Sequence, residues 1–178
     1  MAGAGRLTLH RAFLALWIGG LVAFAIVIML SLPLMLTEVP GGISDHQAAG
    51  TAAEVNRIQK EWRLAGLWNQ AAIAMIADLV FIGVYGAGSV LGGLYFRAIG
   101  AAGMRLLGTI VALAGVIFLL TDYAETLGEL IQLVRFAGDD RLAQLAATMR
   151  PVKMAAWVTT FLGVPIGIYL RRKSRLGA

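Results

Sequence analysis

The chain has 178 residues, of which 59% are hydrophobic and only 14% are charged, and its mean hydropathy is +0.79. Soluble domains average about 25% charged residues, so this composition excludes an ordinary soluble enzyme and points to lipid. Lys and Arg number 15 against 10 Asp and Glu. Anchoring against anionic lipid head groups accounts for this positive charge, and we expect membrane lipids as partners and no nucleic acid.

The histidine and cysteine content limits the chemistry further. The chain has no cysteine, which excludes structural disulfides, thiol redox chemistry and Cys-ligated metals. His10 and His46 both lie outside the apolar stretches, so the paired ligands of a membrane haem are absent, and we interpret His46 as a loop residue. The sequence therefore predicts neither a metal nor a cofactor.

Four apolar stretches are long enough to cross a bilayer, which takes about 20 residues. The first follows a basic N-terminus, but its apolar core exceeds the 7–15 residues of a signal peptide, so we interpret it as an uncleaved anchor. We find no internal repeat and no domain boundary. The sequence therefore predicts a single all-α domain over 1–178, a polytopic four-transmembrane-helix bundle. Its predicted spans are about 12–36, 67–96, 106–134 and 152–170.

The connection between the first two spans carries helical signals. "SDHQ" at 44–47 has a capping-box pattern. Val55, Ile58 and Trp62 then recur at helical spacing up to the second span. We expect an interfacial helix here that runs into the second span.

The connection between the last two spans is similar. "GDDRLAQLAATMRP" at 138–151 places Leu142, Leu145 and Met149 on one side and ends at Pro151. This pattern predicts a second short amphipathic helix that lies on the membrane and stops at the proline.

The basic residues give an expected orientation. Arg6 and Arg11 precede the first span, and "RRKSR" at 171–175 follows the fourth, whereas Arg150 and Lys153 flank the fourth span on its other side. Because basic residues next to a span favour the cytoplasm, we expect both termini there. The resemblance described below implies that the membrane is a bacterial inner membrane.

Acidic residues of the second and third spans fall at one depth. With Arg97 and Arg105 taken as markers of the cytoplasmic interface, Asp78 lies about 28 Å away along its helix, at about 1.5 Å per residue. On the same scale Asp122 lies about 26 Å and Glu125 about 30 Å away. An acid within the bilayer costs about 2.5–3.5 kcal/mol even on lenient scales, so a functional role is the default interpretation.

The helical spacing also groups these acids with other polar residues. Asp78 and Tyr85 share one face of the second span, and Asp122, Glu125 and Glu129 share one face of the third. We expect these five residues to form a polar pocket that opens outward and to be its ligand-binding or proton-handling candidates. Each of two residues also has an alternative without a functional role. Tyr85 would be a core aromatic residue, and Glu129 would be solvated or paired with Arg135.

The Asp78–Tyr85 pattern and the acidic motif "TDYAE" at 121–125 resemble small four-span bacterial membrane proteins of no assigned function. The architecture alone is also similar to the sterol-isomerase and sigma-2-receptor family, whose motifs have no counterpart here. Neither resemblance implies an activity for this chain.

Three functions remain open from the sequence. The pocket binds or acts on a lipid-like or amine small molecule; the protein is a structural or accessory subunit of a membrane complex or a homo-oligomer; or it is a component of a proton- or ion-coupled permease. Whether it is an enzyme, and for which reaction, does not follow from the residues.

Overall fold

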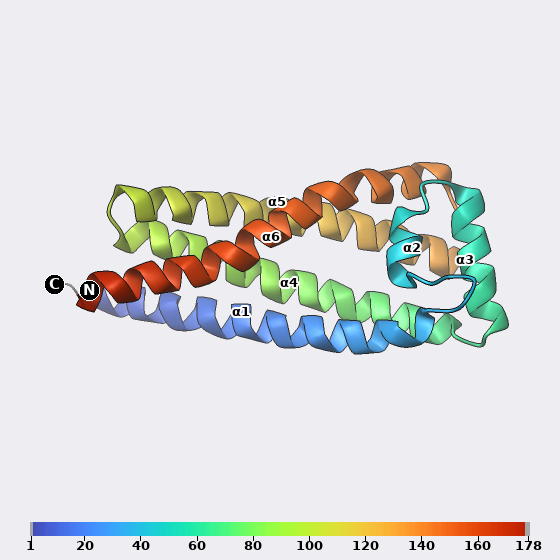
Figure 1. The fold of residues 1–178 in the computed structure, drawn as a ribbon, viewed down its shortest axis with the longest axis horizontal. Helices are drawn as coiled ribbons and strands as arrows, with labels where there is room; N and C mark the ends of the chain where they lie inside the picture. Colours follow the sequence, from blue (N-terminus) through green and yellow to red (C-terminus); the bar gives the residue numbers. More distant parts are fainter. Residues whose placement is uncertain (1, 177–178) are drawn as a thin grey trace.

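The structure, a computed structural model, describes the backbone of residues 2–176 and the side chains of residues 5 and 7–174. The side chains of Arg6 and Arg175, used above for the orientation, lie outside this part. The described chain is helical throughout apart from short connections (Figure 1). Its elements are α1 (Ala2–Ser31), the 3₁₀ helix η1 (Leu32–Leu34), α2 (Ile43–Ala48), α3 (Ala52–Leu64), α4 (Trp68–Ile99), α5 (Ala102–Arg135) and α6 (Asp140–Leu176).

Four of these helices are long and apolar enough to cross a membrane. They cover Leu7–Leu34, Trp68–Ile99, Ala102–Arg135 and Asp140–Ser174. Large apolar side chains remain exposed along all of them, as expected for surfaces that face lipid rather than water. The prediction of an all-α bundle with four candidate spans is confirmed.

Glycines let neighbouring helices approach closely. A Cβ on Gly88 of α4 would collide with the backbone of α1 at Leu16 and Trp17. A Cβ on Gly93, on another face of α4, would collide with the backbone of α5 at Gly108 and Ala112. Close packing replaces the hydrophobic effect between helices in lipid, so these glycines fix α4 between α1 and α5.

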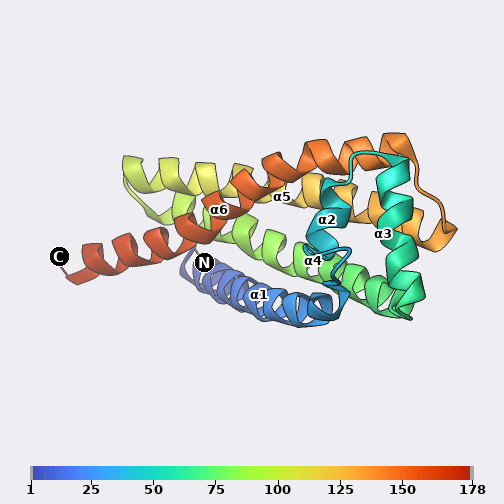
Figure 2. The ribbon, with the colours of Figure 1, turned by 45° about the vertical axis from the view of Figure 1, so that its right-hand side comes forward.

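The fourth long helix crosses the bundle obliquely. α6 begins beside α5 and runs back towards the end of the bundle at which α1 begins, here named the terminal end (Figure 1). Near that end Val164 and Gly167 of α6 pack against α4. Towards the opposite end, α6 diverges from α1 (Figure 2).

The diverging end is covered by η1, α2 and α3 and is here named the cap end (Figure 2). Thr51 caps α3 by accepting a hydrogen bond from the Glu54 N–H at 3.3 Å. Trp62 of α3 is fully buried and donates its indole N–H to the Leu34 carbonyl at 2.9 Å. The helix predicted from Val55, Ile58 and Trp62 is therefore present as α3, and it is fastened to the end of the first span. The predicted capping box at 44–47 and the predicted continuity with the second span are wrong, because Ser44 caps no helix and α3 ends at Leu64 before α4 begins at Trp68.

The second expected interfacial helix is not a separate element. Residues 138–151 were predicted to form a short helix ending at Pro151, but the structure has one continuous helix from Asp140 to Leu176 with Pro151 inside it. A proline removes one backbone hydrogen bond and disfavours the helical conformation of the preceding residue, but packing along α5 keeps α6 helical through this position. Lys153 therefore lies inside a continuous helix rather than at its start.

Candidate functional site

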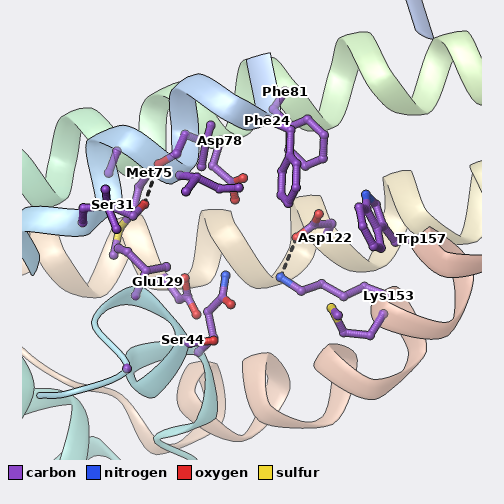
Figure 3. A pocket seen from close by; sticks show the side chains of 18 of the residues that line it. Phe24, Ser31, Ser44, Met75, Asp78, Phe81, Asp122, Glu129, Lys153 and Trp157 are labelled. Atoms are coloured by element: carbon purple, nitrogen blue, oxygen red, sulfur yellow. Dashed lines mark hydrogen bonds and ion pairs between the residues drawn. The ribbon is translucent and has the colours of Figure 1, made fainter. Parts of the chain in front are cut away.

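A cavity of about 310 Å³ lies where α6 and α1 diverge, beside α2 (Figure 3). Its walls come from all four long helices together with η1 and the segment that contains α2. Most of the lining side chains are apolar. The acidic and basic residues that line it are Asp78 of α4, Asp122 and Glu129 of α5, and Lys153 of α6.

Lys153 is the centre of the charged cluster. Its Nζ lies 2.8 Å from Asp122 Oδ1, with which it forms a hydrogen bond, and 2.7 Å from Glu125 Oε1. All three residues are buried, with exposed fractions of 6%, 3% and 0%. One ammonium group therefore connects α6 to two carboxyls of α5, which lie one helical turn apart.

The role of Lys153 was missed by the sequence analysis, which placed it at the membrane flank after a helix-ending proline. Because α6 continues through Pro151, Lys153 lies about 20 Å along the helix from Asp140, at about 1.5 Å per residue. One signal in the sequence could have revealed this role. Lys153 is a charged residue close to an apolar stretch, and helical spacing places it on the same face as Trp157.

Asp78 faces α5, as the antiparallel arrangement of the two helices requires. Its Oδ2 accepts a hydrogen bond from the Thr126 hydroxyl at 3.1 Å, one turn beyond Asp122. Asp78 also lines the cavity, pointing into it from the wall opposite α2 (Figure 3). Thr126 was not singled out from the sequence, because a lone threonine in an apolar helix has no distinguishing pattern.

Glu129 is buried rather than solvated, and it does not pair with Arg135. Its exposed fraction is 1%, and neither carboxyl oxygen has a hydrogen-bond partner among the described residues. The nearest basic atom is His46 Nδ1, 4.0 Å from Oε1, which is too long for a hydrogen bond. Glu129 thus presents an unsatisfied carboxyl group at the cavity wall.

His46 belongs to the buried cap and is not a loop residue. Its Nε2 lies 3.1 Å from the Gln59 amide nitrogen, and its ring packs on Trp62 with centroids 5.3 Å apart. Because an amide nitrogen only donates, Nε2 accepts and the neutral ring carries its proton on Nδ1, facing Glu129. Burial lowers the pKa of His46 to about 4, so the ring is neutral at pH 7.

Aromatic rings close the cavity on its terminal side. Phe24 of α1 packs against Phe81 of α4 and Trp157 of α6, with centroid separations of 5.1 and 5.5 Å. Phe118 of α5 completes this aromatic floor, its ring centroid 5.9 Å from that of Phe81. All four rings line the cavity.

Tyr85 lies one turn beyond this floor and is not among the residues that line the cavity. It is fully buried, packs against Phe81 and Phe118, and exchanges a hydrogen bond of 2.9 Å with the Thr160 hydroxyl of α6. The expected grouping of Tyr85 with the acids is therefore wrong in its geometry: a phenol two turns from Asp78 on α4 falls on the other side of the rings.

The cluster holds more carboxyls than cations. Four carboxyls, those of Asp78, Asp122, Glu125 and Glu129, face a single ammonium group from Lys153. An unpaired charge in a low-dielectric interior costs several kcal/mol, so the excess negative charge must be neutralised by protons or by a cation. The site can therefore exchange protons or bind a positively charged group.

No group of three or more His, Asp or Glu side chains within the described residues is arranged to hold a metal ion. Comparisons of the chain with protein-family models, with curated proteins and with solved structures find no match. The site's geometry and its charge are therefore the basis for a functional proposal.

Proposed function

We propose that this membrane protein binds a lipid-like molecule that carries an amine, with the ammonium group between Asp78 and Glu129 and the apolar part in the cavity. One observation carries the proposal. Glu129 is a buried carboxyl at a cavity wall, and no hydrogen-bond donor reaches it within the described residues. Such a group is costly unless a partner neutralises it, and an ammonium group supplies both the charge and the donors.

The division of charge supports a cation rather than an anion. Lys153 is already engaged by Asp122 and Glu125, so its ammonium is not available to an incoming carboxylate or phosphate. The carboxyls left over are those of Asp78 and Glu129. The apolar lining and the aromatic floor favour a hydrocarbon group next to the charge, as in most small-molecule pockets.

The aromatic floor disfavours the permease alternative, because Phe24, Phe81, Phe118 and Trp157 separate the acids from the terminal half of the bundle. The accessory-subunit alternative predicts that a partner protein's Lys or Arg fills the cavity. A partner protein that co-purifies in stoichiometric amount, with no amine bound, would favour it.

The test is amine binding by the purified protein, followed by native mass spectrometry and by thermal unfolding in detergent. Dodecylamine is the probe, and dodecanol and dodecanoate, which share its chain, are the charge controls. We expect only the amine to bind and to raise the unfolding temperature, since a ligand that binds the native state stabilises it.

Two isosteric variants then test the residues. Glu129→Gln and Asp78→Asn should each weaken dodecylamine binding about tenfold or more, because a hydrogen bond to a charged group contributes about 1.5–3 kcal/mol. Without ligand, Glu129→Gln should be at least as stable as the wild type, since it removes an unsatisfied buried carboxyl. Glu38→Gln, at an exposed carboxyl, is the matched control. Equal binding of amine and alcohol, or unchanged binding by both variants, would contradict the proposal.

We also propose that the protein lies in a bacterial inner membrane with the terminal end in the cytoplasm. Arg11 and Arg97 at the terminal end of α1 and α4 support this orientation, by the preference of basic residues for the cytoplasmic side. The cap end and the cavity would then lie towards the outer surface.

A further inference from the structure

Resting on the proposed function, we infer that the cavity takes its ligand sideways from the bilayer, through an opening between α1 and α6, and that the ligand is a single-chain amphiphile. Its amine reaches the acids while its hydrocarbon chain extends past the rim into lipid. A water-soluble amine that enters from the cap side is the alternative that the experiment separates.

The exposed part of the cavity wall is apolar and lies on two helices. Four of the lining residues are about half exposed and form a rim. They are Ile28 of α1 (46%), Leu32 at the start of η1 (56%), Met35 directly after η1 (54%) and Met154 of α6 (48%). The lining residues of α4 and α5 are buried or nearly so. Since Leu32 and Met154 lie within the candidate spans, we place this rim at the hydrocarbon of the bilayer.

The geometry of α6 accounts for the opening. α1 packs along α4 and α6 along α5, and the two outer helices meet at the aromatic floor, where the rings of Phe24 and Trp157 touch. From the floor to the cap they diverge (Figure 2). A chain leaving the cavity between them would pass Ile28 on one side and Met154 on the other.

The cap side is covered by protein. Gly41, Ile43 and Gln47 of the α2 segment line the cavity from above and are partly buried. The segment is fastened to α6 by the Arg150 guanidinium, which donates to the Ser44 hydroxyl at 3.0 Å, and it is closed on itself by the Gly41 N–H donating to Asp45 at 2.7 Å. The α2 segment therefore lies between the cavity and the cap side, and Ser44 is its exposed lining residue.

The volume limits what fits inside. About 310 Å³ is at the lower end of the roughly 300–1,000 Å³ typical of small-molecule pockets. The space suits one charged group with the first part of one chain and not the two chains of a phospholipid. A longer ligand needs the lateral opening for the rest of its chain.

Chain length is the first test. Butylamine, octylamine, dodecylamine and hexadecylamine are titrated against the protein in lipid nanodiscs, and binding is expressed against the amine's mole fraction in the lipid. With lateral access we expect amines of every chain length to bind. The affinity should change little from octylamine onward, because the added methylenes lie in hydrocarbon both when the amine is bound and when it is free in the lipid. A sharp loss of binding beyond the length that fills the cavity would overturn the inference.

A rim variant is the second test. Met154→Trp should narrow the opening and weaken hexadecylamine binding tenfold or more while leaving butylamine binding within about twofold. Leu162→Trp, on the same helix and 54% exposed but not in the cavity wall, is the matched control and should change neither. If Met154→Trp weakens both amines equally or neither, lateral access is wrong.

The two proposals fail differently. If no amine of any length binds in a manner that depends on Glu129 and Asp78, the proposed function fails. If amines bind through these two residues but only short ones do, the proposed function stands and the lateral route with its single-chain ligand is rejected.

Discussion

Lys153 organises the acidic residues at the scale of single side chains. Its ammonium forms ion pairs with Asp122 and Glu125, which leaves Asp78 held by Thr126 and Glu129 with neither an ion pair to Lys153 nor a hydrogen-bond donor within the described chain. The same residue that makes the cluster tolerable in a low-dielectric interior thus determines which carboxyls remain for a ligand.

Replacing Lys153 by methionine should destabilise the protein by about 3–5 kcal/mol, because removing one partner of a buried ion pair leaves uncompensated charge. Unfolding in mixed micelles at increasing SDS fraction, followed by circular dichroism, measures the loss. Lys60→Met, at an exposed lysine of α3, should change stability by about 0.5 kcal/mol or less.

The loss should be partly reversed by Asp122→Asn in the Lys153→Met background, because the two residues are in contact and their effects are not additive. If Lys153→Met unfolds like the wild type, the ion pairs do not hold α6 to α5.

At the scale of helices, the cap is attached through buried polar contacts as well as apolar ones. α2 places His46 between Gln59 of α3, the ring of Trp62 and Glu129 of α5. The contact with Gln59 needs a neutral imidazole, because Nε2 must be unprotonated to accept the amide hydrogen.

The stability of the cap should therefore depend on pH in a defined window. The pKa of His46 is about 4 in the folded protein and about 6.5 when exposed, so the unfolded state binds the proton first. The stabilisation is complete above pH 6.5 and is lost as the pH falls towards 4, by about 3 kcal/mol at about 1.4 kcal/mol per pH unit.

The measurement compares wild type and His46→Gln by unfolding in detergent at a series of pH values. The difference in stability between them should shrink or reverse from pH 7 to pH 4, while other titrating groups cancel in the comparison. A constant difference across this range would show that His46 does not titrate with unfolding.

At the scale of the whole molecule, four antiparallel spans put both termini at one end and the cap with its cavity at the other (Figure 1). Which end faces the cytoplasm decides whether the site lies in the outer or the inner leaflet. Arg11 lies directly before the first span, whereas no basic residue follows that span before Arg57, and this asymmetry predicts the outer leaflet.

Single cysteines test this orientation cleanly because the chain has none of its own. We expect Lys60→Cys in α3 to react with a membrane-impermeant maleimide in intact cells, and Ser174→Cys near the end of α6 to react only after the membrane is permeabilised. The opposite pattern would place the cavity in the inner leaflet and reverse the proposed orientation.

Much of the fold could be predicted from the residues alone, because lipid imposes a simple rule. A spanning segment must satisfy its own backbone hydrogen bonds, so about 20 apolar residues predict a helix without knowledge of its neighbours. The short link 100–101 makes α4 and α5 antiparallel neighbours, and helical spacing then brings Asp78 to the acids of α5.

Which residues form the site depends on packing between residues far apart in the sequence, and the spacing along one helix does not reveal that packing. Whether Pro151 ends a helix depends on the contacts beyond it, so the depth of Lys153 was misjudged. His46 lies 4.0 Å from Glu129 because the cap folds against α5. Tyr85 lies outside the cavity because four rings from four helices meet between Tyr85 and Asp78. The sequence by itself determined the spans and the common depth of the acids, through the local cost of burying backbone and charge in lipid. Only the tertiary structure decided which acids are neutralised and where the cavity opens, since both depend on how α6 crosses the other three helices.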